Sequence, residues 1–63
     1  MNKWKYDSNR HCYETTLNDN STITILYNNF EIVHNINGEL KQLGHGSSFD
    51  NSIEIAEEYI KTL

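Results

Sequence analysis

The chain has 63 residues, an apolar content of 37%, and nine acidic against five basic side chains, which gives a net charge of −4. A chain this short buries about 60% of its extended surface, so we expect residues 1–63 to form one domain with one thin core layer. That size leaves little room for a substrate cleft and makes an enzyme the least favoured class. The acidic balance also makes direct nucleic-acid binding an unfavoured function, because phosphates are bound by Lys and Arg.

Cys12 is the single cysteine, which excludes an intramolecular disulfide and favours a reducing compartment. No apolar run approaches the roughly 20 residues that cross a bilayer, and the first ten residues lack the apolar core of a signal peptide. We therefore expect a cytoplasmic protein that does not bind membranes.

Turn-forming residues divide the first half of the chain into short strands. Alternation over residues 3–7 predicts a strand with Trp4 and Tyr6 on one face, and residues 12–17 predict a second strand. An Asn-Asp-Asn turn follows, and residues 21–27 then show the clearest period of two in the chain. Their β-branched residues favour a strand over a helix.

A hairpin is predicted in the second half of the chain. The Asn-Asn pair at residues 28–29 permits a tight turn, after which residues 30–36 predict another strand. The Asn-Gly dipeptide that follows fits a two-residue type I′ turn into residues 39–44. This turn predicts three cross-strand pairs: Ile36 with Glu39, His34 with Lys41, and Ile32 with Leu43.

The period becomes helical from about Asp50 to the end of the chain, and Ser48, Asp50 and Asn51 are all competent N-caps. The apolar face of this helix consists of Ile53, Ile55, Ala56, Tyr59, Ile60 and Leu63. The opposite face consists of Asp50, Glu54, Glu57, Glu58 and Lys61. These elements predict an α+β fold, an antiparallel β-meander of three to five strands packed by one C-terminal α-helix.

The run Gly44-x-Gly46-x-Ser48 before this helix resembles the C-terminal half of double-stranded-RNA-binding domains, over about a third of the chain. In that family such a turn caps the helix, small residues pack it on the sheet, and lysines at its start hold phosphates. The resemblance implies that Ser48 is the cap and that Ser52 and Ala56 are packing positions. The positions of the lysines are occupied by Phe49, Asp50 and Ile53. The resemblance therefore implies the shape without the phosphate contacts.

The acidic face of the helix is the candidate site, because a row of carboxylates could imitate phosphates and occupy a basic groove on a partner protein. The alternative is an ordinary solvated helix face. Trp4 is a second candidate, since aromatic side chains are frequent binding hot spots. The predicted partner-binding residues are Asp50, Glu54, Glu57, Glu58 and Trp4.

Metal and nucleophile chemistry is not favoured. His11, His34 and His45 with Cys12 match no zinc-binding spacing, so no metal or other cofactor is expected. A pairing of Ser48 with His45 lacks a nucleophile elbow and an orienting acid, and helix capping is the favoured role of that serine.

The profile of a small, acidic chain that is rich in Asn and Ile, as AT-rich codons dictate, resembles the inhibitors encoded by phages and other mobile elements. Anti-CRISPR proteins are the best-known group. The resemblance implies a protein-binding inhibitor that docks an acidic face on the basic site of a host nucleic-acid-processing protein.

Two alternatives stay open. A nucleic-acid-binding module would require the bases Lys3, Lys5, Arg10 and Lys41 to gather on one face of the sheet. A dimeric antitoxin or regulatory subunit would form a homodimer through an exposed sheet edge.

Overall fold

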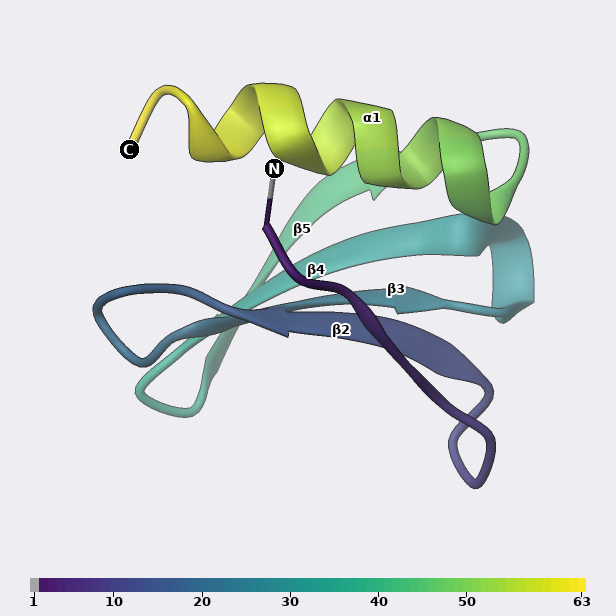
Figure 1. Cartoon of the computed structure of the whole chain (residues 1–63), viewed down its shortest axis with the longest axis horizontal. Helices are drawn as coiled ribbons and strands as arrows, with labels where there is room; N and C mark the ends of the chain where they lie inside the picture. Colours follow the sequence, from purple (N-terminus) through teal and green to yellow (C-terminus); the bar gives the residue numbers. More distant parts are fainter. Residues whose placement is uncertain (1) are drawn as a thin grey trace.

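Five antiparallel strands and one helix make up the computed structural model, which describes residues 2–63 (Figure 1). The strands lie in the sheet in chain order, and α1 crosses one face of that sheet (Figure 1). The elements are β1 (Lys5–Asp7), β2 (Cys12–Thr16), β3 (Thr22–Leu26), the 3-10 turn η1 (Asn28–Phe30), β4 (Glu31–Ile36), β5 (Glu39–His45) and α1 (Phe49–Ile60). The predicted α+β meander with a C-terminal helix is confirmed.

The core lies between α1 and the middle strands. Ile23 and Ile25 alternate along β3 with half-buried residues, and both are fully buried. The register places Ile25 opposite Ile32 in β4, and Ala56 of α1 completes this buried cluster. The period of two in the sequence therefore identified the strand face that meets the helix.

The β4–β5 hairpin confirms the predicted turn but not all of the predicted pairs. Its two turn residues have φ angles of 53° and 87°, as a type I′ turn requires. The two pairs nearest the turn form as predicted. Ile32, however, lies opposite Gly44 and not Leu43, because the register shifts between Ile32 and Val33. A β-bulge adds one residue to one strand, so the predicted Ile32–Leu43 pair is wrong.

The turn before β4 also differs from its prediction. Residues 28–30 form a 3-10 turn in place of a tight two-residue turn, and β4 begins one residue later than predicted. Asn29 and Phe30 both have positive φ, 65° and 53°. Asn tolerates this conformation, but for a bulky aromatic residue it is strained.

Helix α1 begins at a capped turn. The Ser48 side chain accepts a hydrogen bond from the Asn51 amide at 3.0 Å, so Ser48 is the N-cap, as predicted. Ser52 and Ala56 are fully buried, which agrees with their predicted packing role. The predicted apolar arc is only partly right, because Ile55 and Leu63 are exposed. Small side chains occupy the centre of the buried face because the helix lies close to the sheet.

Gly46 lies where the loop before α1 comes close to the helix. Its amide donates to the Ser52 hydroxyl at 3.0 Å, and that hydroxyl donates to the Phe30 carbonyl at 2.8 Å. A Cβ at Gly46 would lie 2.5 Å from Ser52 Oγ and 2.7 Å from Ser52 N. The loop before α1 therefore requires glycine at this position. Within residues 2–63, no helix combines the length and apolar composition needed to span a membrane.

Candidate protein-binding surface

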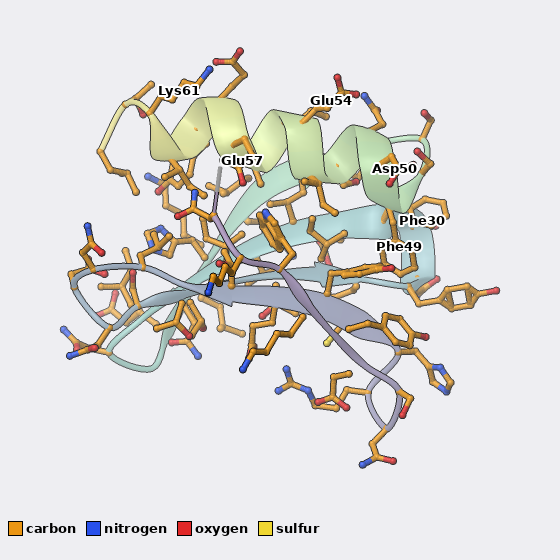
Figure 2. The ribbon with its side chains drawn as sticks, viewed as in Figure 1. Phe30, Phe49, Asp50, Glu54, Glu57 and Lys61 are labelled. Carbon is orange, nitrogen blue, oxygen red and sulfur yellow. The ribbon has the colours of Figure 1, made fainter. Side chains whose placement is uncertain are left out.

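The acidic residues of α1 do not all lie free on its outer side. Asp50, Glu54 and Glu58 are exposed, and Figure 2 shows Glu54 on the side of the helix away from the sheet. Glu58 Oε2 lies 3.7 Å from Lys61 Nζ, an exposed pair that contributes little. Asp50 and Glu54 form no salt bridge within the described residues. Asp50 and Glu54 are therefore the exposed carboxylates of α1 that have no salt-bridge partner.

Glu57 and Trp4 bind each other, which corrects their predicted placement. The Trp4 indole Nε1–H donates to Glu57 Oε2 at 2.8 Å, and the backbone and side-chain amides of Asn2 both donate to the same carboxylate at 3.1 Å. Both Trp4 and Glu57 are half-buried, and Trp4 packs against the core. Residues 2–4 leave the sheet to reach α1, which is why β1 is shorter than predicted (Figure 1).

The carboxyl of Glu57 is ionised more readily than usual. Burial favours its protonated form, but the hydrogen bonds from the Trp4 indole and from Asn2 outweigh that effect and lower its pKa. The negative charge of Glu57 therefore accepts hydrogen bonds from Asn2 and Trp4 within the molecule. Of the four acids on the predicted face, the other three remain exposed.

An aromatic cluster adjoins the start of α1 and was missed as a unit by the sequence reasoning. We define it as Tyr6, Tyr13, Tyr27, Phe30 and Phe49. The Phe49 ring is its centre, with ring centroids 4.8 Å from Tyr13, 5.3 Å from Phe30 and 6.3 Å from both Tyr6 and Tyr27. Tyr6 is 49% exposed and Tyr27 is 62% exposed. Both tyrosine rings therefore present surface to solvent beside the start of α1.

This cluster meets the acidic residues at one end of the molecule. Figure 2 shows Phe30 and Phe49 together below Asp50, which occupies the first turn of α1. The strained φ of Phe30 lies within the same cluster. Backbone strain, exposed aromatic rings and unpaired carboxylates together make this end of the molecule the candidate protein-binding surface. The signal in the sequence was weak, since it is spread over four segments.

The four bases that a nucleic-acid-binding module would require do not all share one surface, because Lys41 lies apart from Lys3, Lys5 and Arg10. Arg10 Nε lies 3.0 Å from Asp7 Oδ2, and its Nη2 lies 2.9 Å from Glu14 Oε2. The two lysines of residues 3–5 belong to the β1 edge of the sheet, whereas Lys41 lies in β5 at the opposite edge. Lys41 Nζ is also 5.8 Å from the centre of the Tyr59 ring.

A chain of side-chain hydrogen bonds, largely buried, links α1 to the sheet, and the sequence pattern did not predict it. Ser21 Oγ donates to Asp19 Oδ1 at 2.5 Å and lies 2.8 Å from His34 Nε2, while His34 Nδ1 lies 2.8 Å from the Tyr59 hydroxyl. Because the Ser21 proton goes to Asp19, His34 Nε2–H must donate to Ser21, and Tyr59 O–H then donates to His34 Nδ1. Four groups thus form one directed chain that ends at a carboxylate.

The order of this chain differs from that of a catalytic triad. In a triad the acid binds the histidine, which removes the proton of the serine. Here the acid binds the serine, and the histidine donates to it. Ser21 and His34 are 6% and 2% exposed, so a substrate has little access to them. The arrangement suits a structural link. Within the described part of the chain, no group of three His, Cys, Asp or Glu side chains is placed to hold a metal ion.

Comparison with known proteins finds no significant match to a family model, a curated protein or a solved structure. A function for the chain is therefore inferred from its own geometry.

Proposed function

We propose that the chain is a small inhibitor that binds a protein rather than catalysing a reaction. Its acidic face of Asp50, Glu54 and Glu58, with the adjoining aromatic cluster, docks on the basic nucleic-acid-binding site of a host protein. The proposed partner is a nucleic-acid-processing protein of the CRISPR type, and the chain is of the phage or mobile-element class. It acts in the cytoplasm, a location consistent with its single buried cysteine.

One observation carries the proposal: unpaired carboxylates lie beside exposed aromatic rings at the start of α1. Residues four apart on a helix rise about 6 Å, so Asp50, Glu54 and Glu58 form a row of charges along the helix. Such a row speeds association with a basic surface, and aromatic anchors then provide most of the affinity. Glu57 and Trp4, which bind each other, act by holding the N-terminal segment in place.

The distribution of bases supports a protein partner over a nucleic acid. Arg10 is paired with two acids, and Lys41 lies at the opposite sheet edge from Lys3 and Lys5. A phosphate backbone would therefore not contact all four bases at once, and one of them is already neutralised by acids. A homodimer through the outer side of β5 would need a long straight edge, and the bulge in the β4–β5 pairing bends it.

Two variants test the proposal with equal changes in charge. The first is Asp50→Lys with Glu54→Lys, and the second is Glu39→Lys with Leu40→Lys and Gln42→Lys, at exposed positions of β5 away from the aromatic cluster. Each variant, immobilised, is incubated with host extract and then challenged with duplex DNA or RNA. We expect the wild type and the second variant to retain a protein that nucleic acid displaces, and the first variant to lose it.

Three results would contradict the proposal. The first is retention of the same protein by the Asp50/Glu54 variant, and the second is retention that nucleic acid leaves unchanged. The third is salt-sensitive binding of duplex DNA or RNA by the purified chain, which would favour the nucleic-acid module. Light scattering on the same samples measures the homodimer directly.

A further inference from the structure

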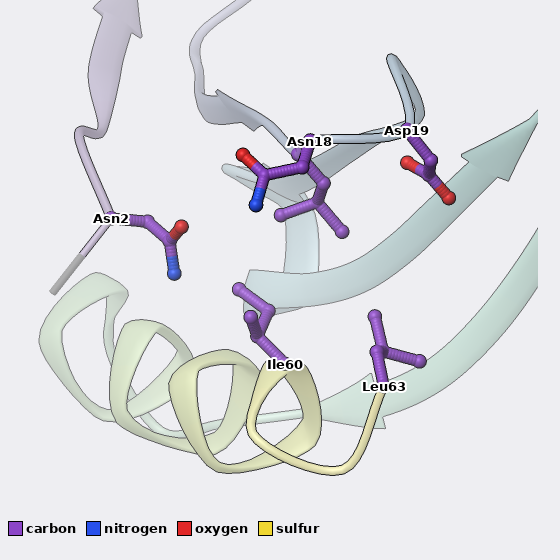
Figure 3. A pocket seen from close by; sticks show the side chains of 6 residues that line it. Asn2, Asn18, Asp19, Ile60 and Leu63 are labelled. Carbon is purple, nitrogen blue, oxygen red and sulfur yellow. The ribbon is translucent and has the colours of Figure 1, made fainter.

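A pocket of about 300 Å³ opens at the C-terminal end of α1 (Figure 3), whereas Phe49 of the aromatic cluster lies at the N-terminal end of this helix. Ile60 and Leu63 approach it from the helix, Asn18 and Asp19 from the turn between β2 and β3, and Asn2 from the N-terminal segment (Figure 3). Its full lining is Asn2, Leu17, Asn18, Asp19, Ile60 and Leu63. The walls are therefore apolar on the helix side and polar at the rim.

The carboxylate at this rim is held in a fixed position from beneath. Asp19 Oδ1 accepts two hydrogen bonds from Ser21, from the hydroxyl at 2.5 Å and from the amide at 2.9 Å. The hydroxyl is itself held by buried His34, which Tyr59 fixes in turn. The hydrogen bond from the Ser21 hydroxyl, and then that from the amide, lower the pKa of the Asp19 carboxyl, so it stays ionised at more acidic pH than an ordinary aspartate.

Among residues 2–63 the rim offers hydrogen-bond acceptors and no basic side chain. In the described chain Asp19 Oδ2 receives no hydrogen bond, and no Lys or Arg lines the pocket. Asn2 Nδ2 donates to Glu57, which leaves the Asn2 amide oxygen as an acceptor. A ligand with a cationic end and an apolar stem matches this chemistry.

We propose that the pocket binds a lysine side chain of the partner protein, with its stem against Leu17, Ile60 and Leu63 and its ammonium on Asp19 Oδ2. Arginine fits less well, because its planar fork binds carboxylates through both oxygens, and Oδ1 is already occupied by Ser21. An ammonium is a compact donor that needs only one carboxylate oxygen and is satisfied further by amide oxygens. The inference rests on the proposed function only in that the partner presents a basic surface.

The test uses small probes and does not need the partner. The chain is titrated with Nα-acetyl-lysine N-methylamide and followed by NMR, with the norleucine and arginine analogues as matched probes. We expect saturable shifts at the Ser21 amide and the Leu63 methyl groups, with a dissociation constant on the order of millimolar. The arginine probe should bind more weakly, and the norleucine probe should give no saturable shift at Ser21.

Three variants separate the pocket from general attraction to acids. Asp19→Asn keeps an acceptor for Ser21 but removes the charge, and should weaken lysine binding by about threefold to fivefold. Leu63→Ala, at a side chain that is 67% exposed, leaves the fold intact and should weaken binding through loss of the apolar wall. Glu39→Gln removes an exposed carboxylate elsewhere and should change nothing.

Three results would overturn lysine binding in this pocket. They are the absence of a saturable shift, an equal response to the norleucine probe, and full binding by both Asp19→Asn and Leu63→Ala. Shifts centred on Asp50 and Glu54 in place of Ser21 would overturn it too. None of these outcomes affects the loss of partner expected for the Asp50/Glu54 variant. Conversely, lysine binding at Ser21 together with normal partner capture by that variant would overturn the proposed function and not the pocket.

Discussion

At its N-terminal end α1 packs mainly through Phe49 on aromatic rings, with one hydrogen bond from Ser52, whereas near its C-terminal end Tyr59 and Glu57 attach it by several side-chain hydrogen bonds. Aromatic contacts involve no donor that must meet an acceptor, so the first end leaves two tyrosine rings partly exposed while they still contact Phe49. The C-terminal end is held by polar side chains, and each buried donor or acceptor there needs a hydrogen-bond partner. Within residues 2–63, no buried side-chain nitrogen or oxygen lacks a partner.

The difference has consequences for stability and for binding. Burial of rings contributes in proportion to the apolar area removed from water, so the aromatic end should carry the larger share of the free energy of unfolding. A single hydrogen bond contributes less, but its loss strands a buried group. The exposed rings are available to a partner, and the polar end fixes the geometry of the pocket beside it.

Phe49→Ala should have the largest effect, because it removes the centre of the aromatic cluster. We expect a loss of about 3 kcal/mol in the free energy of unfolding, measured by urea denaturation. A domain of this length has a free energy of unfolding of roughly 3–9 kcal/mol, so a measurable fraction of the variant molecules should be unfolded even without denaturant. Phe49→Leu, which refills much of the volume, should recover most of the loss. If Phe49→Ala costs less than Tyr59→Phe, the polar end dominates.

Gly46→Ala tests the close approach of the loop to α1. Its Cβ would meet the Ser52 amide nitrogen at 2.7 Å, which is backbone and cannot rotate away. We expect a loss of about 2 kcal/mol by urea denaturation. Gly38→Ala is the control, because its Cβ would have no atom within 4 Å, and the strain of its positive φ alone should cost about 1 kcal/mol. Equal costs for both would mean that the contact at Gly46 is relieved by movement of the loop.

Tyr59→Phe removes the first donor of the buried chain and leaves His34 Nδ1 without a partner. The expected loss is about 1–2 kcal/mol by thermal or urea unfolding. Tyr27→Phe is the matched control, since that ring is exposed and its change should lie within about 0.5 kcal/mol. Equal values for the two variants would show that the buried chain adds nothing to stability.

Glu57→Gln keeps the shape of the side chain but removes the charge that holds Trp4 and Asn2. We expect about 1 kcal/mol of destabilisation and a shift of the Trp4 indole N–H resonance in NMR spectra. Glu54→Gln, at an exposed carboxylate of the same helix, should leave both observables unchanged. An unmoved indole resonance in Glu57→Gln would contradict the link between the N-terminal segment and α1.

The smallest expected effect is on acid stability, and it should be confined to the polar end. The pKa values of Glu57 and Asp19 are lowered from their ordinary values of 4.5 and 3.8. A lowered pKa in the folded state adds stability above the ordinary value, and this contribution is lost as the pH falls through the lower, folded value. We therefore expect unfolding free energy to decline below about pH 4.5 by this contribution, and the decline to be smaller in Asp19→Asn and Glu57→Gln.

Amide hydrogen exchange places this loss within the molecule. Exchange should accelerate first near Tyr59 and the turn at Asp19 and later around Phe49. Uniform acceleration along α1 would show that its two ends are not separately held.

The strands, the type I′ hairpin and the Ser48 cap could be read from the sequence because each depends on residues a few positions apart. The exposed acids of the candidate site, Asp50 and Glu54, followed from the same helical period. The bulge in the β4–β5 pairing did not, since the pattern of side chains does not show an inserted residue. The strained φ of Phe30 has no local signal either.

Secondary elements and most of their buried faces were thus readable from the amino-acid order alone, because hydrogen bonding and side-chain period within one element are local. The hydrogen bonds between distant polar side chains could not be predicted in this way, because they depend on the folded arrangement of the whole chain. Ser21 and His34 are 13 residues apart, His34 and Tyr59 are 25 apart, and Trp4 and Glu57 are 53 apart. These partners are brought together only when α1 closes over the sheet, and the choice among many possible partners is made by the packing of the whole core.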